Sequence, residues 1–509
     1  MKKHHRDAVL EMKRREFIRT AAFGTAALVL PRPLSADPYA PLLSHRSAAE
    51  PVRVRGQVRD GTSGVRGVGV SDGLAVVDTA ADGTFELVTT SQRPYLFCCV
   101  PSEYEIPSSA TGTAAIYRPI RPDARGEMDV VFDLKPLPRY DSKHVVLLLA
   151  DPQTQDDLEM RWMHERTVPD IQALVKSLGD TEVFGIACGD IMYDNLEYFP
   201  EYERAVSRMG VPFFQVVGNH DQDQGSPTDE GSVDTFNRHF GPRYYSFERG
   251  EVHYVVLDDV FWYGSSYLGY LDADQLNWLK ADLARVEPGR TVVVATHIPV
   301  LGSRHTREGE ASSRINISVA NREALYRLLE PYNAHILVGH THESEHLFEG
   351  GVHEHVCGAV CGAWWSGPIC GDGTPNGYAL YEIQGSEVTW RYKATGLGLD
   401  HQIRAYPIGT DPSAPDEIVA NIWDWDPDWT IVWYEDGDRK GAMARRVAHD
   451  PLSAELHTGP DLPPRRNWVE PYPTGHIFYA PASRSARELR VEATDRFGRV
   501  YSVTVPRSA

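Results

Sequence analysis

The stretch that decides the fold is VVLLLADPQTQ, residues 145–155, an apolar run that stops at an acidic residue. Its first six residues are all Val, Leu or Ala, and Asp151 follows them directly. A short, continuous apolar run bounded by polar residues predicts a β-strand whose two faces are both buried. A side chain at the end of such a strand is held on a rigid scaffold, so we expect Asp151 to serve a functional site.

Apolar runs of the same kind recur over residues 140–345. The runs are VFGIACGD, PFFQVVGNHD, HYVVLD, TVVVATH and HILVGH, and each is short and bounded by polar residues. Amphipathic stretches such as DADQLNWLKADLARV (272–286) separate several of them. Continuous apolar strands alternating with amphipathic helices predict an α/β sandwich with covered sheet faces. Residues 378–395 are typical of a closing β-hairpin.

The regions on both sides of this core have a different texture. Residues 51–137 alternate Val with polar residues and contain Asp-Gly and Ser-Gly turns, which predicts a small β-sandwich domain. Residues 398–509 are rich in Trp, Pro and Asp and end in two strand-like runs. We therefore expect a catalytic domain over 138–397, flanked by two small all-β domains.

Composition and charge narrow the function classes. The chain has 509 residues, so several domains are expected. Its net charge is −20, so a nucleic-acid-binding surface is not expected. Beyond the N-terminus, no apolar run is long enough to span a bilayer. Six cysteines are too few for a disulfide framework over this length. The sequence leaves the oligomeric state open.

The N-terminus has the layout of an export signal. Arg14-Arg15 lies in a basic stretch, Phe17 and Ile18 follow, and a weakly apolar run leads to small residues near Ala36. This order resembles a twin-arginine signal peptide. We expect residues 1–36 to be that signal, and the mature protein to reach the periplasm or cell envelope.

Polar residues of metal-ligand type follow five of the predicted strands. Ligands of open α/β sheets sit beyond the carboxyl ends of the strands, so these side chains should share one crevice. Carboxylates and imidazoles together suit Mn, Fe or Zn, with Mg as a further option. Two such ions clamp a phosphoryl oxygen and lower the pKa of water. The residues are Asp151, Asp190, Asn219 with His220 and Asp221, His297, and His340 with His342.

These motifs, in this order, resemble the five motifs of the calcineurin-like metallophosphoesterases, and the resemblance covers about residues 140–345. It implies a metallophosphoesterase-type αββα sandwich, and the flanking β-domains resemble an exported bacterial subgroup. By position, it also implies a role for each motif residue. The bridging ligand of two metals would be Asp190. The first metal would be held by Asp151 and His342, and the second by Asn219, His297 and His340. His220 would contact the phosphate and protonate the leaving oxygen.

The first motif departs from the family pattern. The family usually has Asp-x-His there, and this chain has Asp151-Pro-Gln153. An amide oxygen is a weaker and harder ligand than an imidazole. Two interpretations follow. Either Gln153 is a metal ligand, in a site that binds its metal more loosely or prefers Mn or Mg over Fe, or Gln153 does not bind metal.

Three residues near the crevice have alternative roles. His220 is the expected general acid, because His is the side chain that most often transfers protons near neutral pH. Asp221 follows it and either orients its ring as part of the catalytic machinery or serves as a turn residue. Asn195 either contacts a phosphate oxygen or caps the helix that follows it.

Residues beyond the last motif carry weaker signals. Trp364 and Trp365 either stack on a sugar or base of the substrate or are buried aromatic side chains. His346, His353 and His355 lie past the crevice ligands, and we expect them on the surface and outside any metal site.

The leading hypothesis is a metal-dependent phosphoric-ester hydrolase that acts on a small phosphorylated substrate, with phosphomonoesters favoured. One alternative is a phosphodiesterase for nucleotide, sugar or lipid-headgroup diesters, which needs room for a second alcohol. Another is a degenerate module that binds phosphate or glycans without turnover, an alternative that Gln153 alone supports directly.

Overall fold

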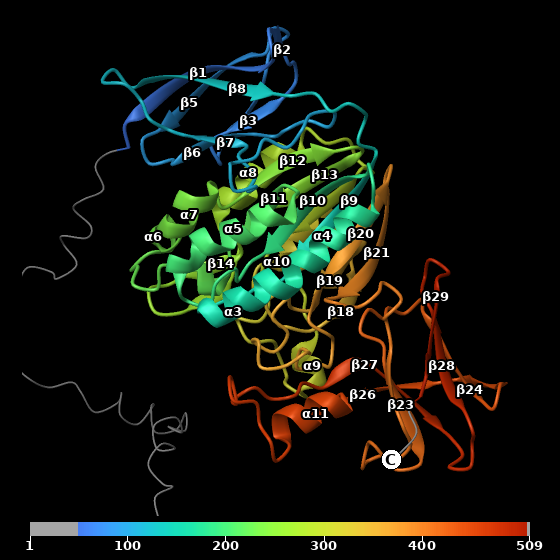
Figure 1. Cartoon of the computed structure of the whole chain (residues 1–509). Helices are drawn as coiled ribbons and strands as arrows, with labels where there is room; N and C mark the ends of the chain where they lie inside the picture. Colours follow the sequence, from blue (N-terminus) through green and yellow to red (C-terminus); the bar gives the residue numbers. More distant parts are fainter. Residues whose placement is uncertain (1–48, 506–509) are drawn as a thin grey trace, which may run out of the picture. The chain divides into compact units, whose positions relative to one another are not determined.

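A computed structural model describes residues 49–505, so the predicted signal peptide lies outside the described residues. Two sheets form the core of the catalytic region (Figure 1). The first has the order β11 (Phe213–Val216), β10 (Glu182–Cys188), β9 (Lys143–Leu149), β20 (Gly377–Gln384) and β21 (Glu387–Ala394). The second has the order β12 (Tyr245–Arg249), β13 (Val252–Val256), β16 (Thr291–Ala295), β17 (Asn333–Val338), β19 (Val352–Val356) and β18 (Glu345–Glu349).

Both faces of β9 are buried, as the opening sequence stretch predicts. Leu147 and Leu149 pack into one apolar cluster with the helices that cover the first sheet. Leu148 and Ala150 pack into a second cluster with residues of the second sheet. Full burial of each leucine contributes about 1.5–3 kcal/mol, so a one-residue shift of this strand would be costly.

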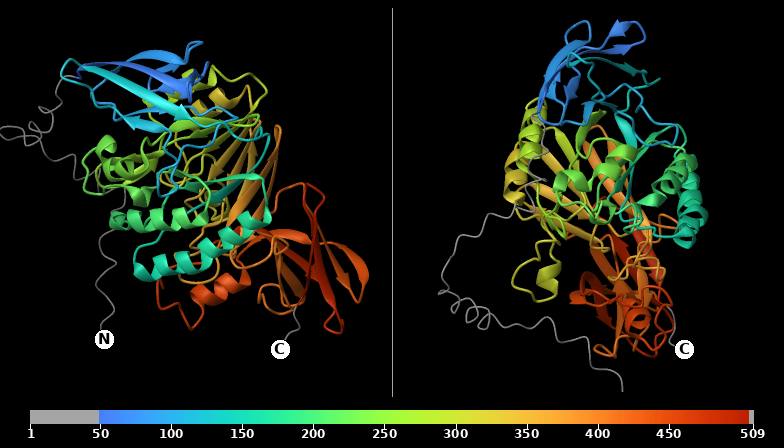
Figure 2. Two further views of the ribbon diagram at one scale, coloured as in Figure 1. Left: turned by 45° about the horizontal axis from the view of Figure 1, so that its top comes forward. Right: turned by 90° about the vertical axis from the view of Figure 1, so that its left-hand side faces the viewer.

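Helices cover the outer faces of both sheets, and Figure 2 shows them on opposite sides of the core. The predicted αββα sandwich is therefore confirmed. The first sheet is covered by α3 (Asp157–Trp162), a π-helical turn η1 (Met163–Thr167), α4 (Val168–Ser177) and α5 (Phe199–Met209). The second is covered by α8 (Ala273–Leu283) and α10 (Arg322–Leu329). Shorter elements are α6 (Asp229–Ser232), α7 (Asp234–Phe240), β14 (Val260–Trp262), β15 (Tyr267–Gly269) and α9 (Arg304–Arg307).

Strand direction determines where the site forms. β9, β10 and β11 are parallel, and so are β13, β16, β17 and β19. Their carboxyl ends therefore open at common sheet edges, where ligands bind in α/β proteins. The hairpin expected over 378–395 is formed by β20 and β21, and β20 runs antiparallel to β9.

The N-terminal region is a small all-β module with two four-stranded sheets. Arg93 and Asp78 in this module form ion pairs with Asp274 and Arg285 of the α8 region, at 2.7 and 2.8 Å. The strands are β1 (Pro51–Asp60), β2 (Ser63–Gly64), β5 (Thr84–Thr90) and β8 (Glu127–Leu134) in one sheet, and β3 (Gly69–Ser71), β4 (Val76–Asp78), β6 (Tyr95–Cys98) and β7 (Tyr117–Pro119) in the other.

The C-terminal region also contains two four-stranded sheets, with an apolar cluster of its own. The strands are β22 (Arg404–Tyr406), β23 (Glu417–Asn421), β26 (Ala444–Ala448) and β27 (Thr474–Pro481) in one sheet, and β24 (Thr430–Glu435), β25 (Asp438–Ala442), β28 (Leu489–Thr494) and β29 (Val500–Thr504) in the other. One helix, α11 (Pro451–Thr458), follows β26. In the described part of the chain, no helix combines the length and apolarity needed to cross a membrane.

A buried histidine in the second sheet makes stability depend on pH. His253 contacts Glu248 and Asp282 at 2.8 Å each. Burial lowers the pKa of His253, but the two carboxylates outweigh it and raise that pKa to about 9, above its ordinary 6.5. The folded state therefore gains stability that is fully present below pH 6.5 and is lost as pH rises through 9, an effect of about 3 kcal/mol.

This effect is measured from the free energy of unfolding in denaturant between about pH 6 and pH 10. The wild type is expected to lose stability over that range, and His253→Gln, which cannot carry the charge, is expected to lose much less. Parallel pH profiles for the two proteins would contradict the prediction.

Candidate metal centre

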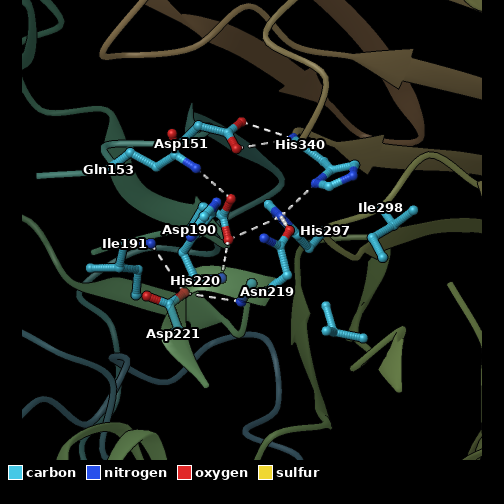
Figure 3. A network of polar contacts seen from close by, with 12 residues as sticks. Asp151, Gln153, Asp190, Ile191, Asn219, His220, Asp221, His297, Ile298 and His340 are labelled. Carbon is cyan, nitrogen blue, oxygen red and sulfur yellow. Dashed lines mark hydrogen bonds and ion pairs between the residues drawn. The ribbon is translucent and has the colours of Figure 1, made fainter. Parts of the chain in front are cut away.

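The predicted ligands converge at the carboxyl ends of the core strands. Figure 3 shows Asp190 near the middle of the group, with contacts from several of the other residues. Most of the group is buried, and His220 and His340 are partly exposed. The strand ends contribute Asp151 after β9, Asp190 after β10, Asn219 to Asp221 after β11, His297 after β16, and His340 and His342 after β17.

The backbone of the site is strained. Six non-glycine residues of the site adopt a positive φ, a conformation that costs about 1–3 kcal/mol each and clusters at functional sites. Because such strain persists only where surrounding structure enforces it, the position of each ligand is set by the fold. The residues and angles are Asp151 (48°), Gln153 (39°), Asp190 (47°), Asp194 (62°), His340 (69°) and His342 (51°).

Glycines before the ligands allow the loops to approach one another. A Cβ atom at Gly218 would lie 2.0 Å from the backbone nitrogen of Asp190. A Cβ atom at Gly189, where φ is +79°, would lie 2.2 Å from Nδ1 of His297. Any larger residue at either position would push the ligand loops apart.

Backbone carbonyls orient the three ligand histidines. Each ring donates a hydrogen bond from one nitrogen to a carbonyl, which leaves a lone pair on the other nitrogen. These contacts are His297 Nδ1 to Cys188 at 3.0 Å, His340 Nε2 to Asn316 at 2.8 Å and His342 Nδ1 to Gly362 at 2.6 Å.

The free ring nitrogens face other acceptor atoms. His297 Nε2 lies 3.2 Å from a carboxylate oxygen of Asp190, 3.2 Å from the amide oxygen of Asn219 and 3.2 Å from Nδ1 of His340. Facing lone pairs repel unless a proton or a metal ion lies between them. Ligand atoms of Asp190, His297 and His340 all lie within 4.8 Å of one another, which suits a single ion.

A second group of acceptors lies beside the first. His342 Nε2 is 3.5 Å from a carboxylate oxygen of Asp151, and among the described residues it has no hydrogen-bond partner. The carboxylate of Asp151 also accepts from the backbone nitrogen of His340 at 2.9 Å. Together the two groups provide carboxylate, imidazole and amide donors for a pair of ions, so the residues present fit a dinuclear metal centre.

Gln153 belongs to this arrangement. Its side-chain nitrogen donates to Oδ2 of Asp190 at 2.6 Å. Its amide oxygen is buried and has no partner within residues 49–505. That oxygen is therefore available to a metal, which supports the ligand interpretation of Gln153, and ligation itself stays a prediction.

Electrostatics favour a cation here. Burial opposes ionisation of Asp190, but His297 and His220 hold its pKa well below the usual range. Burial lowers the pKa of His297, but Asp190 outweighs it and raises that pKa to about 10. Burial and the neighbouring His297 lower the pKa of His340 to about 3. A buried, ionised carboxylate that attracts positive charge in this way is a favourable position for a metal ion.

His220 is oriented by Asp194, which corrects the expected role of Asp221. Nδ1 of His220 contacts Oδ1 of Asp194 at 2.6 Å, and the ring stacks on Tyr193 at 4.4 Å. Burial lowers the pKa of His220, but Asp190 and Asp194 outweigh it and raise it. Sequence reasoning did not assign this role to Asp194, although its place four residues after Asp190 was a signal.

The carboxylate of Asp221 points away from the His220 ring. It accepts three backbone N–H bonds of 2.9–3.0 Å, from Ile191, Met192 and Gly218. The side chain is fully buried. Asp221 therefore holds the loops after β10 and β11 together.

The remaining predicted site residues lie at the rim. Asn195 makes no side-chain cap and donates to the carbonyl of Gln155 at 3.0 Å, so the capping alternative is wrong and phosphate contact stays a prediction. Trp365 is buried and donates to the carbonyl of Pro152 at 3.0 Å. Trp364 stacks on the ligand His342 at 4.2 Å.

Two rim residues come from the C-terminal region, and sequence reasoning did not find them. Trp468 is 52% exposed and lies 4.9 Å from the ring of Trp364. Arg466 lies 4.4 Å from the ring of Tyr193, which in turn stacks on His220. The C-terminal module therefore borders the crevice.

The expected surface position of the histidines beyond the last motif is wrong. His353 and His355 are 7% and 1% exposed, and the side chain of His346 is 3% exposed. They lie on β18 and β19, inside the protein and apart from the crevice.

The fold is of the metallophosphoesterase type, and the residues of the site fit a dinuclear metal centre. Residues 144–344 match the family described as calcineurin-like phosphoesterase, residues 52–137 match the N-terminal region of such proteins, and residues 354–501 match their C-terminal region. The chain belongs to the calcineurin-like phosphoesterase family and carries both of these additional domains. The two groups of acceptors agree with the dinuclear metal centre that the calcineurin-like phosphoesterase family implies.

Phosphatases are among its relatives. The chain is 29% identical to human serine/threonine-protein phosphatase CPPED1 over 200 residues, which are 35% of this chain and 62% of that protein. It is 38% identical to Arabidopsis thaliana purple acid phosphatase 22 over 108 residues, 20% of this chain and 21% of that one. The structure of a dimetal phosphatase from Danio rerio is similar at 14% identity and a TM-score of 0.35, over 49% of this chain and 96% of that one.

Proposed function

We propose that this protein is an exported hydrolase of small phosphoric monoesters. One observation carries the proposal: buried acceptor atoms from five strand ends converge beside His220, whose ring is oriented by Asp194. The phosphatase names of the relatives support monoesters as the substrate class. The twin-arginine-like N-terminus supports export to the periplasm or cell envelope.

The ligand side chains would hold the two ions. Asp190 would lie between them, Asp151, His342 and the amide oxygen of Gln153 would hold one, and Asn219, His297 and His340 would hold the other. Two ions bound there would polarise a phosphoryl oxygen and lower the pKa of water. The hard amide donor favours Mn or Mg over Fe at the first position, and the histidine-rich second position also suits Zn.

His220 would serve as the general acid. Its Nδ1 contacts Asp194, so Nε2 is the nitrogen that is available to protonate the leaving oxygen. The carboxylate of Asp194 stabilises the protonated ring before the transfer and fixes its orientation. The backbone nitrogen of His220 donates to Asp190 at 2.8 Å, which couples the acid to the ligand cluster.

One observation favours diesters as a second candidate substrate class. An open groove of about 1070 Å³ lies beside Asp194 and Asn195 and continues past Gln224 to His239. Such a groove offers space for the second alcohol of a phosphodiester.

The test is hydrolysis of p-nitrophenyl phosphate and bis-p-nitrophenyl phosphate by chelator-treated protein that is reloaded with Mn²⁺, Zn²⁺, Fe²⁺ or Mg²⁺. We expect no turnover without metal, restored turnover with metal, and faster hydrolysis of the monoester. Faster hydrolysis of the diester would replace the monoester proposal with the diester one. Protein that neither binds metal nor turns over would instead be a binding module.

A further inference from the structure

Four histidines outside the crevice lie on one face of the second sheet. In the parallel pairing of β17 and β19, His335 lies opposite His353, and in the antiparallel pairing of β18 and β19, His346 lies opposite His355. Residues that are paired across strands, or that lie two apart along a strand, point to the same face. The strand register therefore gathers four imidazoles from three adjacent strands.

The four rings are in close contact. His335 Nδ1 lies 3.0 Å from His355 Nε2, and His346 Nδ1 lies 3.1 Å from His353 Nε2. The ring centroids of His353 and His355 are 3.7 Å apart. One nitrogen from each of His335, His353 and His355 lies within 4.8 Å of the other two, a spacing that is compatible with three imidazoles around one ion.

Hydrogen bonding leaves unprotonated nitrogens in this cluster. Asp424 lies 3.0 Å from Nε2 of His346, which places the proton of His346 on that nitrogen. The contact between His346 Nδ1 and His353 Nε2 then requires the proton of His353 on Nε2, so its Nδ1 carries a lone pair. Nδ1 of His355 is buried and has no hydrogen-bond partner among the described residues.

The imidazole rings of the cluster are in the neutral form. Burial lowers the pKa of His335 to about 4 and also lowers the pKa values of His353 and His355, so the rings are neutral, the form that binds metals. The nearby guanidinium of Arg496 is compensated, because Asp426 and Asp428 form ion pairs with it at 2.8 and 2.7 Å.

We propose that His335, His353 and His355 bind a structural zinc ion, and that His346, oriented by Asp424, accepts the Nε2 proton of His353 behind it. Sites with three imidazole donors suit Zn²⁺, and hydrogen-bonding partners behind ligand histidines are a common arrangement. Asp424 follows β23 in the C-terminal module, and its other oxygen accepts from the backbone nitrogen of Tyr392 at 3.2 Å. The ion would thus fasten the C-terminal module to the catalytic core, and its presence does not depend on phosphoesterase activity.

The test measures zinc in a protein whose catalytic ligands are removed, so that only the proposed site can bind. The background is the variant Asp151→Asn/Asp190→Asn/His297→Ala/His342→Ala of the full chain, loaded with Zn²⁺, desalted and analysed by mass spectrometry for metals. We expect one zinc per chain, and a rise in Tm of at least about 3 °C over the chelator-treated protein. Replacing His353 and His355 with Gln in this background should remove the zinc and the rise in Tm.

A matched control separates metal binding from the general effects of changing a buried histidine. His457 on α11 is 4% exposed, and its Nε2 also has no partner in the described part of the chain. His457→Gln in the same background should keep one zinc per chain. X-ray absorption at the zinc edge of the background variant should show only nitrogen or oxygen neighbours, with imidazole scattering, even if the glutamine variants fail to fold.

The proposal is overturned if the folded background variant holds less than about 0.1 zinc per chain. It is also overturned if a folded His353→Gln/His355→Gln variant keeps its zinc. Failure of the phosphatase assay would leave these zinc measurements unchanged, so the two proposals fail separately.

Discussion

Asp190→Asn is expected to lower kcat/KM for p-nitrophenyl phosphate by about 10³-fold or more. Asp190 is the buried carboxylate that His297, Gln153 and the backbone of His220 all contact. An amide at this position cannot carry the negative charge that holds a pair of ions. Loss of several kcal/mol of transition-state stabilisation from the ions corresponds to that factor.

The measurement combines steady-state kinetics with metal analysis on the same preparations. The variant should lose metal from the centre together with activity, and excess Mn²⁺ or Zn²⁺ should restore little of either. Asp450→Asn is the control for replacing a fully buried aspartate outside the centre: Asn still caps α11, and Tm is measured as well because Asp450 also accepts from Tyr406 and Asn421. Near-normal kcat/KM in Asp190→Asn would contradict the assignment of this carboxylate.

His220→Ala is expected to slow the hydrolysis of an alkyl phosphate by about 10²–10⁴-fold, the usual contribution of general acid catalysis. The loss should be much smaller for p-nitrophenyl phosphate, because nitrophenolate leaves without being protonated. Asp194→Asn should also lose more activity on the alkyl phosphate than on p-nitrophenyl phosphate. Its losses should be smaller than those of His220→Ala, since Asp194 acts through the His220 ring.

The ratio of the activity losses on the two substrates distinguishes a residue that transfers a proton from one that only stabilises the structure. Asp221→Asn should lower Tm because it disturbs a buried acceptor of three backbone N–H groups, and it should change both substrates by a similar factor. Equal losses on both substrates in His220→Ala would show that His220 binds phosphate without delivering a proton.

Much of the fold was predictable from local sequence, for a physical reason. Continuous apolar runs such as residues 145–150 must be buried on both faces, and amphipathic helices between them supply the cover. The convergence of the candidate ligands was also predictable, because each follows a strand closely, and parallel strands bring their carboxyl ends to common edges.

The partner of His220 was not predictable in this way. Asp221 is adjacent in sequence, but the short turn over Asn219–Asp221 directs its carboxylate toward backbone N–H groups. Asp194, which lies 26 residues away along the chain, reaches the ring instead. Side-chain direction in a tight turn depends on backbone angles, which sequence order does not reveal.

The histidine cluster and the crevice rim depended on tertiary structure alone. His335 meets His353 only because β17 pairs with β19, and Trp468 meets Trp364 only because the C-terminal module borders the crevice. The order of short-range patterns was enough to identify the class of fold and to name the residues that the structure brings together in the crevice, because each of these follows from residues that are neighbours in sequence. Contacts between distant segments depend on strand register and domain packing, and these are set by the burial of the whole chain.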